Sequence, residues 1–377
     1  MIRTASIAAI VAFAGSASAQ FAPGSLLYIS DARTTGGTDT INVLDYGPLT
    51  SSTLFTFGAD TQDSSTRGGL AQGPNGEFYV HQTNFPVLDP STASISRVDD
   101  LFGTASNSSF AMNPELQQVT GITYDSFSDS VLVLNNPGSS FNVPFEFEGL
   151  QSYDRATGSY DGLSVPETPN DDINSVGGGF VGTGRAAGQF YYGSLNGGVD
   201  IDNSLPGDGS RTASAIARTQ LNNPADPLDD TTEILVDLSP SVTGASEHLG
   251  LLRGMDVLPN GNIVFLDANS FNIWEVALDA NGDFDSLNVL FDGSAIARSS
   301  RSLGSGIIYN PFTDKLNYIE FTGVAGVQDI VEINLDGTGR TILASGLSQI
   351  NSLVAIPAPA SVALLGLGGL AAIRRRR

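Results

Sequence analysis

The sequence predicts an all-β fold, a six-bladed β-propeller, and three observations support this prediction. A turn followed by a short apolar strand occurs six times along the chain. The apolar residues that open these strands, from Leu26 to Leu316, are spaced by 52, 53, 59, 73 and 53 residues, and propeller blades usually repeat every ~40–50 residues. The last apolar segment of the repeats also supplies a strand that the first repeat lacks, as closure of a ring requires.

Residues 1–19 are predicted to form a secretory signal peptide. Arg3 gives a positive first region, an apolar stretch follows, and Ala17 and Ala19 form an A-x-A cleavage site before Gln20. A buried first helix is the alternative, but this stretch has no polar face that would make it amphipathic. We therefore expect the mature chain to begin at Gln20.

A hairpin turn opens each repeat. Asn75-Gly76 and Asn260-Gly261 lie between apolar segments, and this dipeptide favours tight hairpins because both residues tolerate positive φ. The other turns use Gly or Asp in related ways, at Pro23-Gly24, Ser128-Asp129, Ala187-Gly188 and Thr313-Asp314.

Strand-like segments follow each turn. The second strands of the six repeats are predicted to be LLYIS, FYVHQ, VLVLNN, FYYGS, IVFLDA and LNYIEF. The third strands are predicted at 41–46, 94–99, 150–155, 214–219, 272–279 and 329–336. Fourth strands are visible as TLFTF, EILVDL, LNVLF and RTILA, and they are weak in the second and third repeats.

A glycine marks the first strand of five repeats, in GGLAQ, TGITY, GGFVG, RGMDV and SGIIY. The first repeat lacks such a strand because the mature chain begins almost at its turn. The segment at 350–357, INSLVAIP, is predicted to supply it and to close the ring. A solenoid of open β repeats is the alternative, but it does not explain the matched ends.

Two repeats carry long insertions. The third repeat contains Pro137 to Phe147, and the fourth contains Gly197 to Arg211 and Asn222 to Asp230. Insertions in a rigid repeat tend to gather on one face, and they often form its binding surface. Aromatic residues in or after the first insertion, Phe141, Phe145, Phe147 and Tyr153, are expected to cover the blade rather than to face a sugar or a protein.

The C-terminal segment is predicted to be a sorting tail. Pro357 and Pro359 precede an apolar run, Ser361 to Ile373, and the chain ends in Arg374, Arg375, Arg376 and Arg377. This run has 13 residues, whereas a membrane-spanning helix needs about 20. A permanent anchor would therefore be marginal, although the arginines match the positive-inside rule.

This tail resembles the PEP-CTERM sorting signal of bacterial exosortase substrates, with Ala358 where that family has Glu. The resemblance implies export, retention at the membrane by the tail, which forms a sorting helix, and removal of the tail by an exosortase-type enzyme. The predicted parts are thus a signal peptide (1–19), a propeller (20–356) and a tail (357–377).

The composition of the chain excludes several classes of function. The chain has no Cys, two His and a net charge of −23, which excludes disulfide scaffolds and cysteine metal sites and argues against nucleic acid as a partner. An acidic surface with a single Lys, Lys315, suits a salty exterior.

The repeats resemble the six-bladed propellers of the NHL and gluconolactonase-like groups. The second group binds a divalent cation at the centre of the ring through carboxylate and Asn side chains of the inner strands. Here the residues before the inner-strand glycines are Gly68, Thr120, Gly178, Arg253 and Ser305, and none is Asn or an acid. Lactonase activity is therefore disfavoured.

Candidate catalytic residues occur around the fifth repeat. Glu247, His248, Arg253 and Asp256 could supply a base, an acid and an anion clamp if they converged at the mouth of the channel. An exposed loop is the plainer interpretation. His81 follows a strand and is expected at the rim, and no G-x-S-x-G nucleophile motif occurs.

Calcium is the cofactor that the sequence admits, although none is required. Oxygen-bearing residues alternate at Asp279, Asn281, Asp283 and Asp285, but Leu290 stands where an EF-hand loop has Glu. An Asn-Gly hairpin is the favoured alternative. Asp200, Asp202 and Asp208 form a weaker calcium candidate in the fourth-repeat insertion.

These observations favour an exported cell-surface or extracellular-matrix propeller with a non-catalytic role in recognition or scaffolding. Its expected partners are the export machinery, an exosortase-type enzyme, and exopolysaccharide or surface proteins. A secreted hydrolase or lyase is the alternative, and a structural component of a surface layer is a third possibility.

Overall fold

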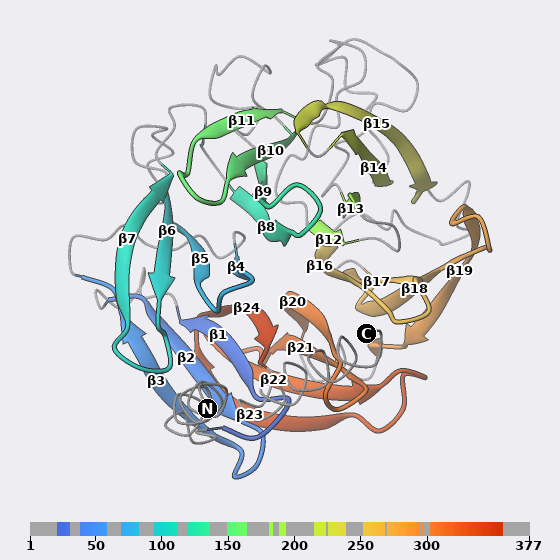
Figure 1. Ribbon diagram of the computed structural model, residues 1–377. Coiled ribbons are helices and arrows are strands. Elements are labelled where there is room, and N and C mark those ends of the chain that lie inside the picture. The colour runs from blue at the N-terminus through green and yellow to red at the C-terminus, as the bar shows by residue number, and fades with distance from the viewer. Residues whose placement is uncertain are drawn as a thin grey trace, which may run out of the picture.

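The computed structural model describes residues 21–30, 38–58, 69–82, 94–111, 116, 119–135, 149–163, 181–183, 188–193, 215–223, 225–238, 252–267, 270–294, 296 and 302–356. Six four-stranded antiparallel sheets surround a central axis (Figure 1), which confirms the all-β, six-bladed prediction. The predicted signal peptide and sorting tail lie outside these residues. Within them, no helix is long and apolar enough to cross a membrane.

Blades 1 to 3 follow the predicted repeats. Blade 1 contains β24 (Ile350–Ala355), β1 (Leu26–Ser30), β2 (Thr40–Asp45) and β3 (Thr50–Thr56). Blade 2 contains β4 (Leu70–Gln72), β5 (Phe78–Gln82), β6 (Ser94–Asp99) and β7 (Ser106–Ala111). Blade 3 contains β8 (Val119–Asp125), β9 (Ser130–Asn135), β10 (Gly149–Asp154) and β11 (Tyr160–Leu163).

Blades 4 to 6 have the same order. Blade 4 contains β12 (Val181–Thr183), β13 (Gln189–Gly193), β14 (Ala215–Asn223) and β15 (Asp226–Asp237). Blade 5 contains β16 (Leu252–Val257), β17 (Ile263–Asp267), β18 (Asn272–Leu278) and β19 (Phe284–Phe291). Blade 6 contains β20 (Ser302–Asn310), β21 (Lys315–Phe321), β22 (Val327–Asn334) and β23 (Thr341–Ser348).

One predicted insertion is a continuation of the sheet. Asn223 pairs with Asp226, and Leu221 pairs with Asp230, so the predicted insertion at 222–230 extends the hairpin of β14 and β15. Backbone pairing in this outer hairpin accepts polar side chains because one face meets water. The insertions at 137–147 and 197–211 lie outside the described residues.

Ring closure joins the two ends of the propeller. β24 is the innermost strand of blade 1 and pairs antiparallel with β1, from Leu26 opposite Ala355 to Ser30 opposite Ile350. Without β24, the edges of β1 and of its neighbours would be open to pairing with other chains. The predicted closure by the C-terminal strand is confirmed.

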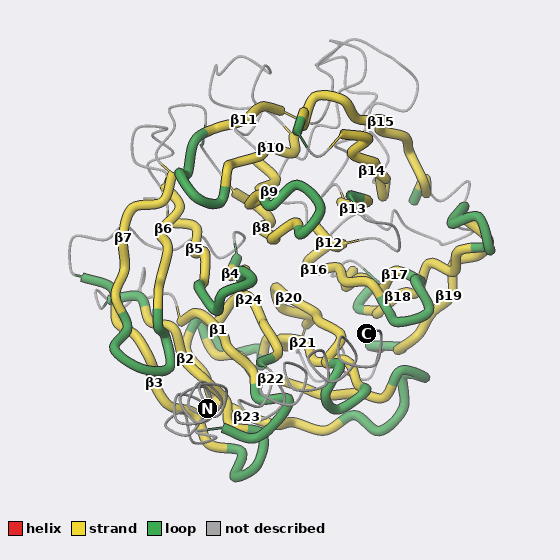
Figure 2. Tube along the Cα trace, viewed as in Figure 1, coloured by secondary structure: helices red, strands yellow, loops and turns green. Residues whose placement is uncertain are grey.

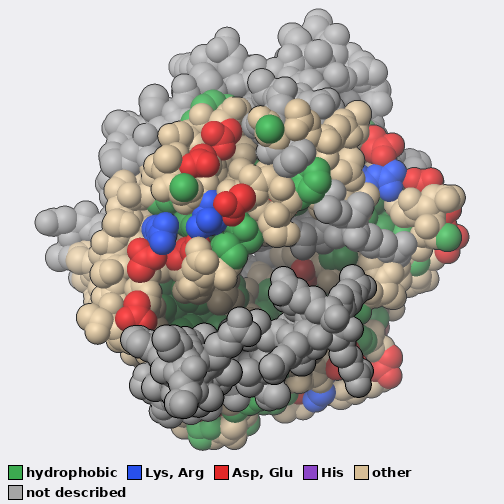
Figure 3. All heavy atoms as spheres, viewed as in Figure 1, with side chains coloured by type: hydrophobic (Ala, Val, Ile, Leu, Met, Phe, Trp, Pro, Cys, Tyr) green, Lys and Arg blue, Asp and Glu red, His purple; other side chains and the backbone are tan. Residues whose placement is uncertain are grey.

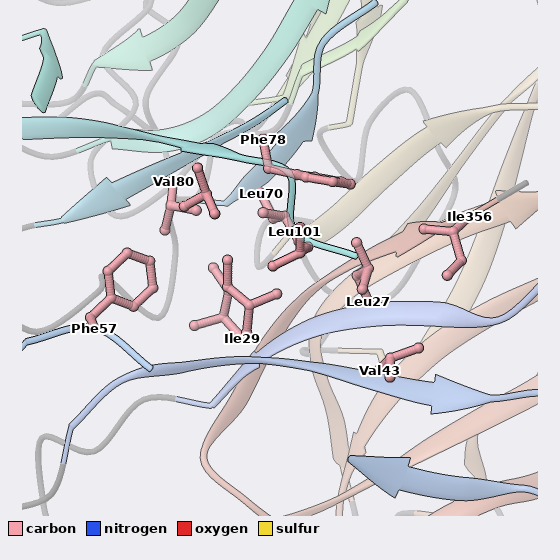
Figure 4. Packing of buried hydrophobic residues seen from close by; sticks show 11 residues of the cluster. Leu27, Ile29, Val43, Phe57, Leu70, Phe78, Val80, Leu101 and Ile356 are labelled. Carbon is pink, nitrogen blue, oxygen red and sulfur yellow. The ribbon is translucent and has the colours of Figure 1, made fainter. Parts of the chain in front are cut away.

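The core lies between blades. Successive side chains of a strand point to opposite faces, so Leu26 and Tyr28 pack toward blade 6 while Leu27 and Ile29 pack toward blade 2. Figure 4 shows the second of these contacts, where Leu27 and Ile29 lie near Phe78. Each second strand is buried on both faces, which explains its continuous apolar sequence.

The two faces of the ring differ. We call the side with the turns after the first and third strands of each blade the turn face, and the side with the connections after the second and fourth strands the loop face. Turns on the turn face have at most six residues, whereas the connection after β13 on the loop face has 21. Figure 2 shows these segments as green and grey stretches between yellow strands.

Candidate functional site

The inner strands approach one another closely at their glycines. A Cβ added to Gly254 of β16 would lie 2.8 Å from the backbone nitrogen of Ile307 and 2.9 Å from the Cα of Gly306. A Cβ added to Gly69 would lie 2.9 Å from a methyl carbon of Ile122. At these two contacts between neighbouring blades, the inner strands leave no room for a side chain, which favours glycine.

Ser352 takes the place of this glycine in blade 1. It precedes Leu353, the partner of Tyr28, just as Gly69 precedes Leu70, the partner of Val80. Its φ of 55° lies in the left-handed region that non-glycine residues seldom occupy. Its Oγ lies 3.5 Å from the position of a Cβ on Gly69, so this hydroxyl lies beside the inner strand of blade 2.

The residue before Ser352, Asn351, is a candidate that the glycine pattern of the sequence does not reveal. In the gluconolactonase-like pattern, the position before the inner-strand glycine supplies metal ligands, and in blade 1 this position is Asn351. Its side chain is 1 % exposed. The glycine pattern does not mark the closing strand, because this strand has serine where the other blades have glycine. One Asn does not make a metal site, and among the described residues no three His, Asp or Glu side chains are placed to hold an ion.

Asp256 joins blades 5 and 6. It lies on β16 opposite Val264, and its carboxylate accepts hydrogen bonds from the backbone N–H of Tyr309, at 2.7 Å, and of Val257, at 2.8 Å. Burial raises its pKa to about 6, although both hydrogen bonds act in the opposite direction. This raised pKa leaves the carboxyl with a larger protonated fraction near neutral pH than an ordinary Asp has, which favours a role as a general acid.

The side chains of the other predicted catalytic residues lie outside the part of the chain that the structure describes. Glu247 and His248 lie in the connection between β15 and β16, outside the described residues. Arg253 belongs to β16, but its side chain is outside the description. Convergence of these four side chains at the channel mouth therefore stays a prediction.

His81 is buried, and its expected position at the rim is wrong. Its side chain is 1 % exposed, and neither ring nitrogen has a hydrogen-bond partner. On β5 it points to the same side as Tyr79, toward blade 3. Burial lowers its pKa to about 3, so the imidazole is neutral at physiological pH and behaves as a core residue.

The predicted calcium segment forms a hairpin turn between β18 and β19. One carboxylate oxygen of Asp279 accepts the N–H groups of Asn281, at 2.8 Å, and of Asp283, at 3.0 Å. Asp283 contacts the Arg218 guanidinium at 2.9 Å, and Asp285 lies on β19. Local turn bonds and an ion pair thus engage oxygens that a cation would need. The other calcium candidate, Asp200, Asp202 and Asp208, lies outside the described residues.

Arginine side chains link adjacent blades near the turn face. Arg155 of blade 3 contacts Asp129 in its own blade and Glu77 of blade 2, at 3.3 Å. Arg218 of blade 4 contacts Glu233 in its own blade, and it also donates to the carbonyl oxygen of Gly282 in blade 5 at 2.6 Å. Basic side chains accordingly lie next to acidic ones on the face drawn in Figure 3.

Tyr153 confirms one expectation about the aromatic residues. It lies on β10, is fully buried, and its hydroxyl donates to Gln151 at 2.7 Å. Its ring centroid is 5.6 Å from that of Tyr160, so it covers the blade, as expected. Phe141, Phe145 and Phe147 lie outside the described residues.

Comparison with known proteins supports the fold alone. No protein-family model matches the sequence, and no curated protein matches it. TolB from Acinetobacter baumannii matches with a TM-score of 0.52 and 14% identity, over 88% of this chain and 66% of the TolB chain. The chain thus spans just under two thirds of that protein. At this identity the likeness shows a shared propeller fold.

Two other solved structures match less closely in shape. A calcium-binding protein, regucalcin, from Agrobacterium tumefaciens has a TM-score of 0.43 and 14% identity, with 72% of each chain covered. A protein from Lactobacillus plantarum has a TM-score of 0.48 and 13% identity, covering 86% of this chain and 82% of that one.

Proposed function

We propose that the chain is an exported β-propeller of the cell surface or extracellular matrix, and that it binds polysaccharide or protein without catalysis. A predicted signal peptide and a predicted sorting tail support export. The closed ring supplies a rigid support, since β24 pairs with β1 and side chains of one blade bond to the next blade.

The loop face is the proposed binding surface, and the lengths of its connections are the observation that supports this proposal. The connections after β9 and after β13 have 13 and 21 residues, and they leave from the same position in two adjacent blades. Turns on the turn face have at most six residues. Long connections on a rigid scaffold are typical of recognition surfaces.

Binding can be tested with residues 20–356 and exopolysaccharide purified from the cells that produce the protein. Replacing residues 197–211 with a Gly-Ser segment of equal length should reduce binding at least tenfold. The control variant Ala156→Arg lies on the turn face and should bind as the wild type does. Retained binding in the loop variant, with both proteins folded by circular dichroism, would refute the loop face as the binding surface.

Export can be tested separately by fractionating producing cells. The full chain should be found at the membrane or cell surface, and a chain ending at Ile356 should appear in the medium. Cytoplasmic accumulation of both chains would refute the proposed export.

Asp256 favours a second candidate, a secreted hydrolase or lyase, because its pKa of about 6 suits a general acid near neutral pH. This candidate predicts release of new reducing ends from the same exopolysaccharide, and loss of that release in Asp256→Asn. Binding without any release by the wild type would refute it.

A further inference from the structure

Both ends of the propeller leave the ring at its turn face. Ala355, the last residue of β24, pairs with Leu26 at the start of β1. Beyond this pair, the N–H of Ile356 donates to the carbonyl oxygen of Ser25 at 2.9 Å. The N–H of Gly24 donates to the carbonyl oxygen of Ile356 at 3.3 Å. In the other blades a hairpin turn joins the first and second strands at this place, and in blade 1 the two ends of the propeller occupy it.

The exit point lies near the centre of the turn face. β24 is the innermost strand of its sheet, and Figure 1 shows it beside β4 and β20 around the axis. The chain that continues from Ile356 therefore starts at the middle of one face rather than at the rim.

The spacer that follows is short. Four residues, Pro357 to Ala360, separate Ile356 from the predicted hydrophobic segment. Whatever their conformation, four residues span at most ~14 Å. A compact domain of this length has a radius of gyration of ~20 Å and is therefore roughly 50 Å across, and strands of five to seven residues make the ring ~20 Å thick.

These dimensions restrict how the ring can lie against a bilayer. To bring the loop face to the membrane, the chain would have to run from the centre of the turn face to the rim and then past the thickness of the ring. That path is about 45 Å, more than twice the reach of the spacer. The short spacer allows the turn face to approach the bilayer and prevents the loop face from doing so.

We propose that the turn face is the surface that faces the lipid bilayer, and that the loop face is directed away from it, toward the exterior. This inference rests on the proposed function, because it requires the tail to hold the protein at a membrane. It adds an orientation, in which the proposed recognition surface is the part farthest from the lipid.

The tail, and not adsorption of the turn face, sets this orientation. Asp100, Asp283 and Asp336 are exposed in turns on the turn face, and carboxylates are repelled by anionic headgroups. We therefore expect residues 20–356, which lack the tail, to remain unbound when mixed with anionic vesicles.

The absence of cysteine in the chain allows a direct test. Ala156, in the turn after β10, and Ala325, in the connection after β21, are exposed alanines on opposite faces. Each is changed to Cys in the chain 20–377, labelled with a donor fluorophore, and reconstituted into phosphatidylcholine vesicles whose headgroups carry an acceptor. Energy transfer should be clearly greater from Ala156→Cys than from Ala325→Cys, since the positions of the two labels along the ring axis differ by the thickness of the ring, ~20 Å.

Two outcomes would overturn the inference, and flotation of the vesicles separates them. If the labelled chain floats with the vesicles and transfer is equal or reversed, the orientation is wrong while membrane retention stands. If the chain does not float, the tail does not hold the protein at the bilayer, and both the orientation and this part of the proposed function fail.

A lengthened spacer tests whether the short spacer is the cause of the proposed orientation. Insertion of 20 Gly-Ser residues after Ile356 gives a flexible spacer with an average reach of roughly 27 Å and a much greater maximum. The transfer efficiencies of the two labels should then converge. A difference that persists unchanged would show that something other than spacer length orients the ring.

Discussion

At the scale of single residues, burial decides what the ionisable side chains do. His81 lies on β5 where the equivalent strands have aliphatic residues, among them Ile29 on β1 and Ile319 on β21. Its two ring nitrogens have no hydrogen-bond partner, and a buried polar group without a partner typically costs about 1–3 kcal/mol. The imidazole thus destabilises an otherwise apolar contact between blades 2 and 3.

The variant His81→Leu should be more stable than the wild type, and the gain should grow as the pH falls. The folded-state pKa of about 3 lies below the unfolded value of 6.5, so the unfolded chain binds the proton first and the wild type loses stability below pH 6.5. Between pH 7 and pH 4.5 the additional gain should be ~2–3 kcal/mol. Urea unfolding of both proteins at the two pH values measures it.

The matched control is Ile29→Leu, at the equivalent position of β1. It introduces no titrating group, so its effect on the free energy of unfolding should be the same at both pH values. A gain in His81→Leu that does not change with pH would contradict a depressed pKa for this imidazole.

Asp256 should show the opposite dependence on pH. Its folded-state pKa of about 6 is higher than the usual 3.8, so the ionised form is disfavoured in the fold and stability falls as the pH rises from 4 to 7. Relative to Asp256→Asn, the wild type should lose up to ~3 kcal/mol over this range. Thermal unfolding of both proteins across the range checks the difference, and parallel curves would contradict it.

At the scale of elements, glycine determines how closely the inner strands pack. Gly254 has the backbone of β20 against it, and backbone cannot move aside as a flexible side chain can. The sequence showed a glycine in five first strands, but periodicity alone gave no reason for it. The reason is the contact between blades, which is absent from any single strand.

The variant Gly254→Ala should therefore destabilise the propeller by ~1–3 kcal/mol, because the added methyl group overlaps with Ile307 and Gly306. The control is Gly58→Ala, where a Cβ would have nothing within 4 Å. That change should be neutral or slightly stabilising, since it lowers the entropy of the unfolded chain. Chemical denaturation of the two variants compares them, and equal effects would argue against close packing at Gly254.

At the scale of the whole molecule, closure by β24 makes the ring one cooperative unit. Residues 20–349 lack this strand, so the edge of β1 would be exposed and the apolar residues Leu353 and Ile356 would be missing from two blade contacts. Exposed strand edges pair with other chains.

We expect residues 20–356 to be monodisperse by size-exclusion chromatography and to unfold in one transition, and residues 20–349 to aggregate or to unfold broadly. A monodisperse, cooperatively unfolding 20–349 chain would show that the other five blades are sufficient. The peptide 350–356 added in trans should partly restore the shorter chain, because β24 binds by backbone pairing along β1.

The sequence by itself determined the number of blades, the order of the strands and the closing strand. These features depend on local patterns: a turn that needs positive φ, a second strand apolar on both faces, and a regular spacing. The sequence also predicted the signal peptide and the sorting tail, because both are recognised from composition. It did not show that the insertion at 222–230 extends a hairpin, because that depends on pairing between strands.

Only the tertiary structure decided the positions of the candidate residues relative to one another. Asp256 meets Tyr309, which is 53 residues away in the sequence, and Ser352 reaches Gly69 because the ring closes. Burial of His81 likewise depends on blade 3, which follows it in the chain. Contacts between blades arise from the folding of distant segments, so a local pattern cannot contain them, and the pairing of β24 with β1 places both ends of the propeller on one face.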